Sequence, residues 1–176
     1  GFNNVNLETI AIIFMIISSL PFVLYLKAIR GRPIDIIKDQ QVRGFFKTLF
    51  IASIAVISYL IIFKDFVSFD AIRYSLFNVT SILTGTGFVT AEYDMWGTPI
   101  ILVFLFITFI GGCAGSTTCG IKIFRLQIIY YNSKETIGKL ISPNRVINKK
   151  YNGEHISQEI TQSVITFLFI LSLIHI

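Results

Sequence analysis

The sequence predicts an all-α, polytopic membrane protein, and three observations support this fold class. Of its 176 residues, 53% are hydrophobic and only 14% are charged, whereas a soluble domain has about a quarter charged residues. Apolar segments close to the ~20 residues that cross a bilayer recur along the chain. The 15 Lys and Arg residues are concentrated between certain of these segments, as expected when connecting loops lie on alternate sides of a membrane.

The first part of the chain contains two predicted spans separated by a basic loop. The first span is 7–26, and Pro21 is expected to kink it. The loop 27–47 carries six Lys and Arg residues. The second span covers 48–63 and is expected to include 44–47 as well, because the apolar stretch alone is short for a bilayer.

A shorter, amphipathic segment follows and is predicted to be re-entrant. The stretch FDAIRYSLFNVTSIL, residues 69–83, has 15 residues and would be about 22 Å long as a helix, which is too short to cross. Ser68 or Asp70 is expected to be its N-cap. Tyr93 and Trp96, which come after it, are expected to lie at the level of the lipid headgroups.

The third span begins near Thr98 and is predicted to break within GGCAGSTTCG, residues 111–120. A continuous helix from Trp96 to Tyr131 would be about 54 Å long, well beyond a hydrocarbon core of ~30 Å. Glycine lowers helix preference by about 1 kcal/mol per residue, so the break is expected at this cluster. A polar linker follows, and a last span is predicted to start near Ile160.

Positive charges predict the orientation of the spans. Loop 27–47 carries six Lys and Arg residues, 64–95 carries two and 121–159 carries seven. The positive-inside rule therefore assigns 27–47 and 121–156 to the cytoplasm and 64–95 to the opposite side. We expect a multi-pass protein of the inner, cytoplasmic membrane.

The stretch TSILTGTGFVT, residues 80–90, contains the candidate functional site. Non-helical backbone at membrane depth is tolerated only inside protein or along a water-filled path. Gly85 and Gly87 permit backbone angles that other residues resist. They can therefore turn successive carbonyl oxygens toward one axis, where the oxygens replace the hydration shell of an alkali cation. The C-terminus of the preceding short helix adds partial negative charge.

Two strings in the sequence resemble a known family. FNVTSILTGTGFVTAEYDMWG, residues 77–97, and FIGGCAGSTTCGIKIFRLQ, residues 109–127, are similar to the Trk/Ktr/HKT superfamily of potassium transporters, in particular to its bacterial Trk membrane (pore) subunits. That family folds one chain into four non-identical M1–pore helix–M2 repeats around a single pore, in a potassium-channel-like fold. The chain is therefore interpreted as a fragment around the third repeat.

The resemblance also implies how the fragment is divided. The expected parts are the last transmembrane helix of the preceding repeat at 1–30, a cytoplasmic linker at 31–44, an M1–P–M2 repeat at 45–131, a second cytoplasmic linker at 132–156, and the truncated first helix of the next repeat at 157–176.

The resemblance implies the site residues, the transported ion and the partners. Potassium, bound in the filter as the transported ion, is expected at the backbone carbonyls of Thr84, Gly85, Thr86, Gly87 and Phe88. An intramembrane gating loop is expected at Gly111, Gly112, Gly115, Ser116, Thr117, Thr118 and Gly120. The implied partners are membrane lipid, a second copy in a homodimer of the full-length protein, and a cytosolic nucleotide-binding regulatory subunit; no nucleic acid is expected. Because the stretch lacks the TVGYG string of tetrameric channels, sodium is a possible second substrate.

Other interpretations of the same residues remain open at this stage. The glycine and threonine residues of either string also suit close helix packing. The main functional alternative is an alternating-access, cation-coupled carrier with broken helices. A membrane-embedded enzyme or a non-conducting assembly subunit is a third possibility. No paired-carboxylate, triad or metalloprotease pattern occurs in a suitable setting, so the protein is predicted not to be an enzyme.

Overall fold

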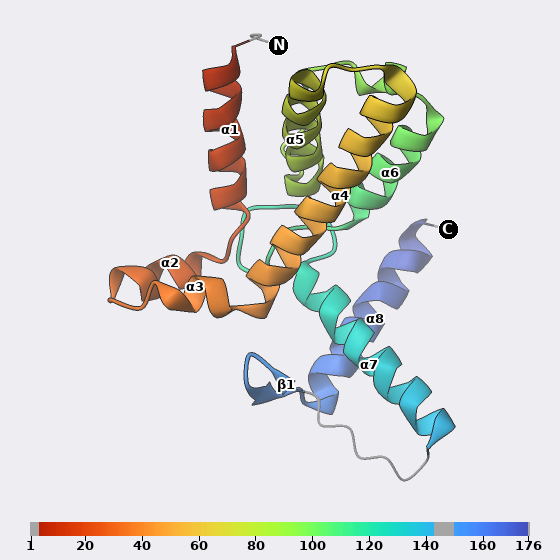
Figure 1. The fold of residues 1–176 in the computed structure, drawn as a ribbon. Helices are drawn as coiled ribbons and strands as arrows, with labels where there is room; N and C mark the ends of the chain where they lie inside the picture. Colours follow the sequence, from red (N-terminus) through yellow and green to blue (C-terminus); the bar gives the residue numbers. More distant parts are fainter. Residues whose placement is uncertain (1–3, 143–149, 176) are drawn as a thin grey trace. The chain divides into compact units, whose positions relative to one another are not determined.

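The computed structural model describes residues 4–142 and 150–175, which form helices and one two-stranded hairpin (Figure 1). The chain divides into two compact units, residues 1–123 and 124–176. The first unit contains helices α1 to α6 and the loop that follows α6. The second contains most of α7, the hairpin and α8. Residues 1–3 and 176, at the ends of the predicted first and last helices, and 143–149 of the predicted linker lie outside the described residues.

The first predicted span is two helices. Helix α1, Val5–Ser18, and helix α2, Phe22–Ile29, meet at an angle of 92°, so the bend expected at Pro21 is confirmed, and it breaks the helix in two. Pro21 lacks an N–H, and the hydroxyls of Ser18 and Ser19 both donate to the carbonyl of Met15. This corner leaves backbone carbonyls that accept hydrogen bonds from another part of the unit.

Helix α4 is the longest helix of the described residues, and a short helix α3, Ile34–Lys38, precedes it. Helix α4 runs from Gln40 to Lys64, and its 25 residues correspond to about 37 Å. Its N-cap is Asp39, whose carboxylate accepts from the amide of Gln41 at 2.8 Å. Within the described residues, α4 is long and apolar enough to cross a membrane, and the bent pair α1–α2 adds a second candidate if it is counted as one span.

Helix α5, Ser68–Thr84, lies inside the first unit, in contact with α1, α4 and α6 (Figure 1). Buried positions occupy every face of its C-terminal half, from Phe77 to Ser81. The expected N-cap at Ser68 or Asp70 is wrong, because the cap position is Val67, which makes no side-chain cap bond. Asp70 instead lies in the first helical turn, where a carboxylate interacts favourably with the helix dipole.

A 3₁₀ turn η1, Tyr93–Trp96, leads into helix α6, Thr98–Phe109. Trp96 is only 4% exposed and packs against the rings of Phe66 and Phe104 at centroid distances of 6.4 and 6.2 Å. Trp96 is therefore covered by neighbouring aromatic rings. Its expected level at the lipid headgroups stays a prediction.

The second unit contains α7, Ile123–Ile141, the strands β1, Lys150–Tyr151, and β2, Glu154–His155, and helix α8, Gln158–His175. The guanidinium of Arg125 lies 3.7 Å from the ring centroid of Phe167, which joins α7 to α8. The hydroxyl of Tyr151 donates to Gln127 at 3.0 Å, which joins the hairpin to α7. The predicted linker is thus partly helical and partly hairpin.

Candidate functional site

Residues 85–90, which we call the filter segment, leave the helix immediately after Thr84 (Figure 1). Gly85 has φ +70° and is the C-cap of α5, a conformation that favours glycine. The carbonyl of Ser81 accepts from the amides of Thr86 at 3.0 Å and Gly87 at 3.4 Å. These bonds reverse the chain at the end of α5 and start the filter segment in a fixed geometry.

The carbonyl oxygens of this stretch have no hydrogen-bond donor within the described residues. They belong to Thr84, Gly85, Thr86, Gly87 and Phe88. Gly85 to Phe88 are exposed on the first unit, so their unpaired carbonyls are open to an ion or to water as ligand. The C-terminus of α5 contributes partial negative charge next to them.

Gly87 and Thr90 define the geometry of the outer part of the filter segment. Gly87 has φ +77°, and a Cβ built on it would meet nothing within 4 Å. Further along, the amide of Thr90 donates to the side-chain oxygen of Asn78 at 3.4 Å. The filter segment is therefore held by α5 at both ends, at Ser81 and at Asn78, with open space beside Gly87.

Residues 110–122, which we call the intramembrane loop, separate α6 from α7. The two ends of the loop are hydrogen-bonded: the amide of Gly111 donates to Ile121 at 2.8 Å, and that of Ile121 donates to Phe109 at 2.9 Å. A Cβ on Gly111 would collide with the backbone oxygen of Cys119 and lie 3.0 Å from the carbonyl carbon of Gly120. Only glycine fits this crossing, and the predicted break in the third span is confirmed.

Thr118 is the hydrogen-bonding centre of the intramembrane loop. Its Oγ1 accepts from the amide of Gly112 at 3.0 Å and from the Nζ of Lys122 at 3.0 Å, and it lies 2.8 Å from the hydroxyl of Ser116. Lys122 also donates to the Thr118 carbonyl. Ser116 donates to the carbonyl of Cys113 at 2.6 Å. The hydroxyl residues therefore satisfy backbone groups that the helix break frees.

The intramembrane loop is also bonded to two other helices of the first unit. The amide of Cys113 donates to the carbonyl of Ser19 at 3.1 Å, and the amide of Phe22 donates to the carbonyl of Gly115 at 3.0 Å. Both bonds join the loop to the corner between α1 and α2. The amide of Ala114 donates to the side-chain oxygen of Gln41, on α4, at 2.7 Å.

The filter segment and the intramembrane loop lie against each other. A Cβ built on Gly85 would be 3.4 Å from the Cβ and 3.5 Å from the amide nitrogen of Cys119. The loop therefore contacts the C-terminal end of α5, where the unpaired carbonyls begin. The two strings singled out in the sequence therefore lie against each other at Gly85 and Cys119.

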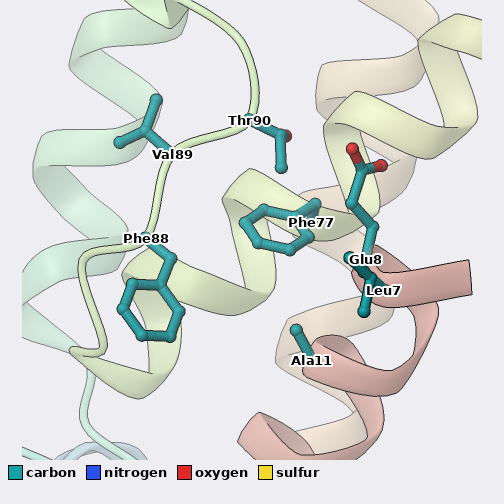
Figure 2. A pocket seen from close by; sticks show the side chains of 7 residues that line it. All are labelled: Leu7, Glu8, Ala11, Phe77, Phe88, Val89 and Thr90. Atoms are coloured by element: carbon teal, nitrogen blue, oxygen red, sulfur yellow. The ribbon is translucent and has the colours of Figure 1, made fainter. Parts of the chain in front are cut away.

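A pocket of about 440 Å³ lies on the other side of the filter segment, toward α1 (Figure 2). Its wall contains Phe88, Val89 and Thr90 of the filter segment, together with Phe77 of α5 and Glu8 of α1. Glu8 forms a bidentate ion pair with Arg73 of α5.

Comparison with known proteins identifies the family of the chain. The family model described as TrkH, cation transport protein, matches residues 1–176. The chain belongs to the TrkH family. It is 34% identical over 157 residues to the Trk system potassium uptake protein TrkI of Halomonas elongata, a match covering 89% of this chain and 32% of that protein. It is 31% identical over 174 residues to the Trk system potassium uptake protein TrkG of Escherichia coli K12, covering 98% of this chain and 36% of that protein.

The crystal structure of the potassium transporter TrkH from Vibrio parahaemolyticus has the same fold as the chain. The match has a TM-score of 0.91 at 27% identity and covers 98% of this chain and 38% of that one. The predicted fold class is therefore confirmed as the helical fold of a TrkH-family membrane protein. The chain spans about a third of the length of the relatives that it matches.

Several residues that contact the two glycine-rich segments were not predicted from the sequence. Gln41 and the Ser18–Ser19 corner hold the intramembrane loop, and nothing in their local pattern distinguishes them. Glu8 and Arg73 did carry a signal, because a charged residue within an apolar or re-entrant segment is a candidate functional residue. Their pairing depends on the contact between α1 and α5.

Proposed function

We propose that the protein containing this chain takes up potassium, or another monovalent cation, across the cytoplasmic membrane. The observation that supports this function is the row of unpaired carbonyls from Thr84 to Phe88, which follows the buried helix α5. Carbonyl oxygens of this kind can replace the water around an alkali ion. The relatives named as potassium uptake proteins support the same substrate.

The ion is coordinated by backbone oxygens and therefore needs no charged side chain at the filter segment. Gly87 has φ +77°, a backbone conformation that residues with a side chain resist. This conformation sets the direction of the adjacent carbonyls. The filter segment has a glycine at Gly87 but lacks the full TVGYG string of tetrameric potassium channels. Sodium is therefore a second substrate of the same pathway.

The intramembrane loop is the proposed gate, at Gly111, Gly112, Gly115, Ser116, Thr117, Thr118 and Gly120. Its contact with Gly85 supports this role, because a loop at the inner end of the carbonyl row blocks the path until it moves. Deleting 112–115 is expected to raise basal cation flux at normal membrane abundance. A deletion that reaches the membrane and keeps the wild-type flux would contradict the gate.

The proposed orientation places 27–47 and 121–156 in the cytoplasm and 64–95 on the outer side. The distribution of Lys and Arg supports this orientation: 27–47 carries six, 121–159 carries seven and 64–95 carries two. Cytoplasmic loops are enriched in these residues. Cysteine accessibility at Lys38 and Asp94 tests it: only a cysteine at Asp94 should react with an impermeant reagent from outside.

Rubidium uptake by cells that lack other potassium-uptake systems tests the proposed function. Cells expressing the full-length protein should accumulate rubidium, and excess potassium should compete for uptake. Sodium should compete more weakly. Absence of rubidium uptake by protein that is present in the membrane would contradict the proposal.

An alternating-access carrier is the second candidate, and one observation favours it. Two broken helices meet in the first unit, since the α1–α2 corner binds the loop between α6 and α7, and broken helices form the substrate site of many carriers. Flux measured against imposed proton and sodium gradients separates the two. A carrier predicts strict coupling to a second ion, and a pore predicts potassium flux without one.

The proposed partners are membrane lipid, a second copy of the full-length protein, and a cytosolic nucleotide-binding subunit. The family resemblance alone supports the last two. Large apolar side chains on the surface of the first unit, such as Phe50 and Phe106, support contact with lipid or with other membrane segments. Copurification of the full-length protein and its mass in detergent test the dimer and the subunit.

A further inference from the structure

An ion pair between the partly buried Arg73 and the buried Glu8 joins two helices that are far apart in the sequence. Arg73 Nε donates to Glu8 Oε2 at 2.5 Å and Arg73 Nη2 donates to Glu8 Oε1 at 2.7 Å. The two side chains are 13% and 7% exposed. Glu8 lies in the first turns of α1 and Arg73 near the start of α5. The pair thus links the helix before the repeat to the helix before the filter segment.

The geometry of this ion pair defines a relative position of the two helices. A guanidinium presents its donors as a rigid planar fork, so a bidentate contact fixes direction as well as distance. Removing Arg73 leaves the Glu8 carboxylate, which is only 7% exposed, without its ion partner, and this is unfavourable. Sliding or rotation of α5 against α1 therefore strains or breaks these two hydrogen bonds.

The position of α5 in turn determines where the filter segment lies. Arg73, Phe77 and Ser81 are spaced four residues apart and therefore lie along one face of α5. The Ser81 carbonyl accepts from the amides of Thr86 and Gly87, and the Asn78 side chain accepts from the amide of Thr90. The same helix that the ion pair positions thus holds the filter segment at both ends.

The pair also lies beside the outer part of the filter segment. Glu8 shares a pocket with Phe88, Val89 and Thr90, and Figure 2 shows the ring of Phe77 between Phe88 and Glu8. Phe88 is 60% exposed, so packing alone does not hold this part of the segment in the first unit. Its position depends on α5 and on the hydrogen bonds that α5 supplies.

We propose that Glu8 and Arg73 are a positioning pair for ion selection. By setting the depth and rotation of α5 against α1, the pair sets the spacing of the carbonyls at Thr84–Phe88. This inference rests on the proposed function. The pair does not bind the ion and does not belong to the gate. It acts through Ser81 and Asn78 on the filter segment.

The test is the ratio of rubidium to sodium uptake in the full-length protein, normalised to the amount of protein in the membrane. For Glu8→Gln and Arg73→Gln we expect the ratio to fall about tenfold, the factor that 1.4 kcal/mol of lost discrimination produces. Total cation uptake should persist. Arg73→Lys, which keeps the charge and loses the fork, should give an intermediate ratio.

Two further variants keep the test decisive. The exchange Glu8→Arg with Arg73→Glu should recover part of the ratio that either single change loses. Glu8→Asp keeps the charge and shortens the side chain, so it should reach the membrane normally and still lower the ratio. Glu135→Gln is the matched control, because Glu135 pairs with the exposed Lys139 at 2.7 Å in the second unit and its loss should leave the ratio unchanged.

The outcomes separate this inference from the proposed function. If the wild-type protein takes up no rubidium, the proposed function fails and the inference fails with it. If the wild-type protein discriminates and every variant of Glu8 and Arg73 keeps its ratio, only the inference is overturned. It is also overturned if the single variants fail to assemble while Glu8→Asp keeps the wild-type ratio, because the pair would then serve folding alone.

Discussion

The filter segment and the intramembrane loop are both non-helical and rich in glycine, and they touch at Gly85 and Cys119. Their hydrogen bonding is opposite. The filter segment and the residue before it leave successive carbonyls without donors among the described residues, whereas the loop is bonded to itself, to the α1–α2 corner and to α4. The first region leaves its carbonyls unpaired, and the second uses its backbone hydrogen bonds to hold a shape.

Glycine serves a different purpose in each region. Gly87 has a positive φ and open space around it, so glycine is needed there for its backbone conformation and not for lack of space. Gly112 has no room for a side chain, because a Cβ there would lie 2.6 Å from Thr118 Oγ1 and 3.1 Å from the carbonyl of Ser19. Substitutions should therefore affect ion selection in the filter segment and assembly or gating in the loop.

The largest effect is expected for Gly111→Ala. The new methyl would overlap the backbone of Cys119 and Gly120, and overpacking costs about 1–3 kcal/mol or more. We expect a lower melting temperature of the purified protein and increased basal flux of the fraction that assembles. Gly115→Ala is the control, because space is open there and only the left-handed φ opposes alanine. If both variants lost the same melting temperature, the close backbone contact at Gly111 would matter no more than the left-handed φ at Gly115.

Gly87→Ser is expected to have the next largest effect. It should change the selection between ions and leave the stability of the protein nearly unchanged. A serine at φ +77° costs about 1–2 kcal/mol in the left-handed region, so the carbonyls of the filter segment should rotate. The rubidium-to-sodium uptake ratio should fall while membrane abundance stays close to wild type. A wild-type ratio at normal abundance would show that Gly87 lies outside the ion path.

Gln41→Ala should have a smaller effect that is limited to the loop. It removes the acceptor for the Ala114 amide, and a hydrogen bond of this kind contributes about 1 kcal/mol. We expect a modest rise in basal flux with an unchanged rubidium-to-sodium ratio. Thr48→Ala is the control on the same helix, because its hydroxyl donates only within α4, to the carbonyl of Gly44. A changed ratio in Gln41→Ala would mean that the two regions do not act separately.

Thr86→Val is expected to have the smallest effect. It removes a hydroxyl that lies 2.7 Å from the hydroxyl of Thr84, worth about 0.5–1.5 kcal/mol, and keeps every backbone carbonyl. The uptake ratio should change by less than in Gly87→Ser. A loss as large as that of Gly87→Ser would show that the side-chain hydroxyls, and not the carbonyls alone, select the ion.

Much of the first unit could be predicted from local features of the sequence. The helix break at 110–122 follows from length, because a helix from Trp96 to Tyr131 would exceed the membrane and the glycines have the weakest helix preference. The end of α5 at Thr84 follows from the glycines after it, which suit the left-handed cap seen at Gly85. These features depend on residues next to each other in the chain.

Other features could not be predicted because distant parts of the chain decide them. Pro21 predicts a kink, but the 92° corner also depends on the loop that donates to Ser19 and accepts from Phe22. Trp96 suits a membrane interface by composition, yet the rings of Phe66 and Phe104 bury it. The hairpin at 150–155 lies in a stretch that the sequence predicted only as a polar linker.

The sequence by itself determined the class of fold, because hydrophobic length and charge distribution are local properties, and its two glycine-rich strings carried the resemblance to the family. Only the tertiary structure decided that these strings touch, that Gln41 and the α1–α2 corner hold the loop, and that Glu8 pairs with Arg73. The physical reason is that a buried charge or a broken helix must find its partner wherever the packing of helices brings one.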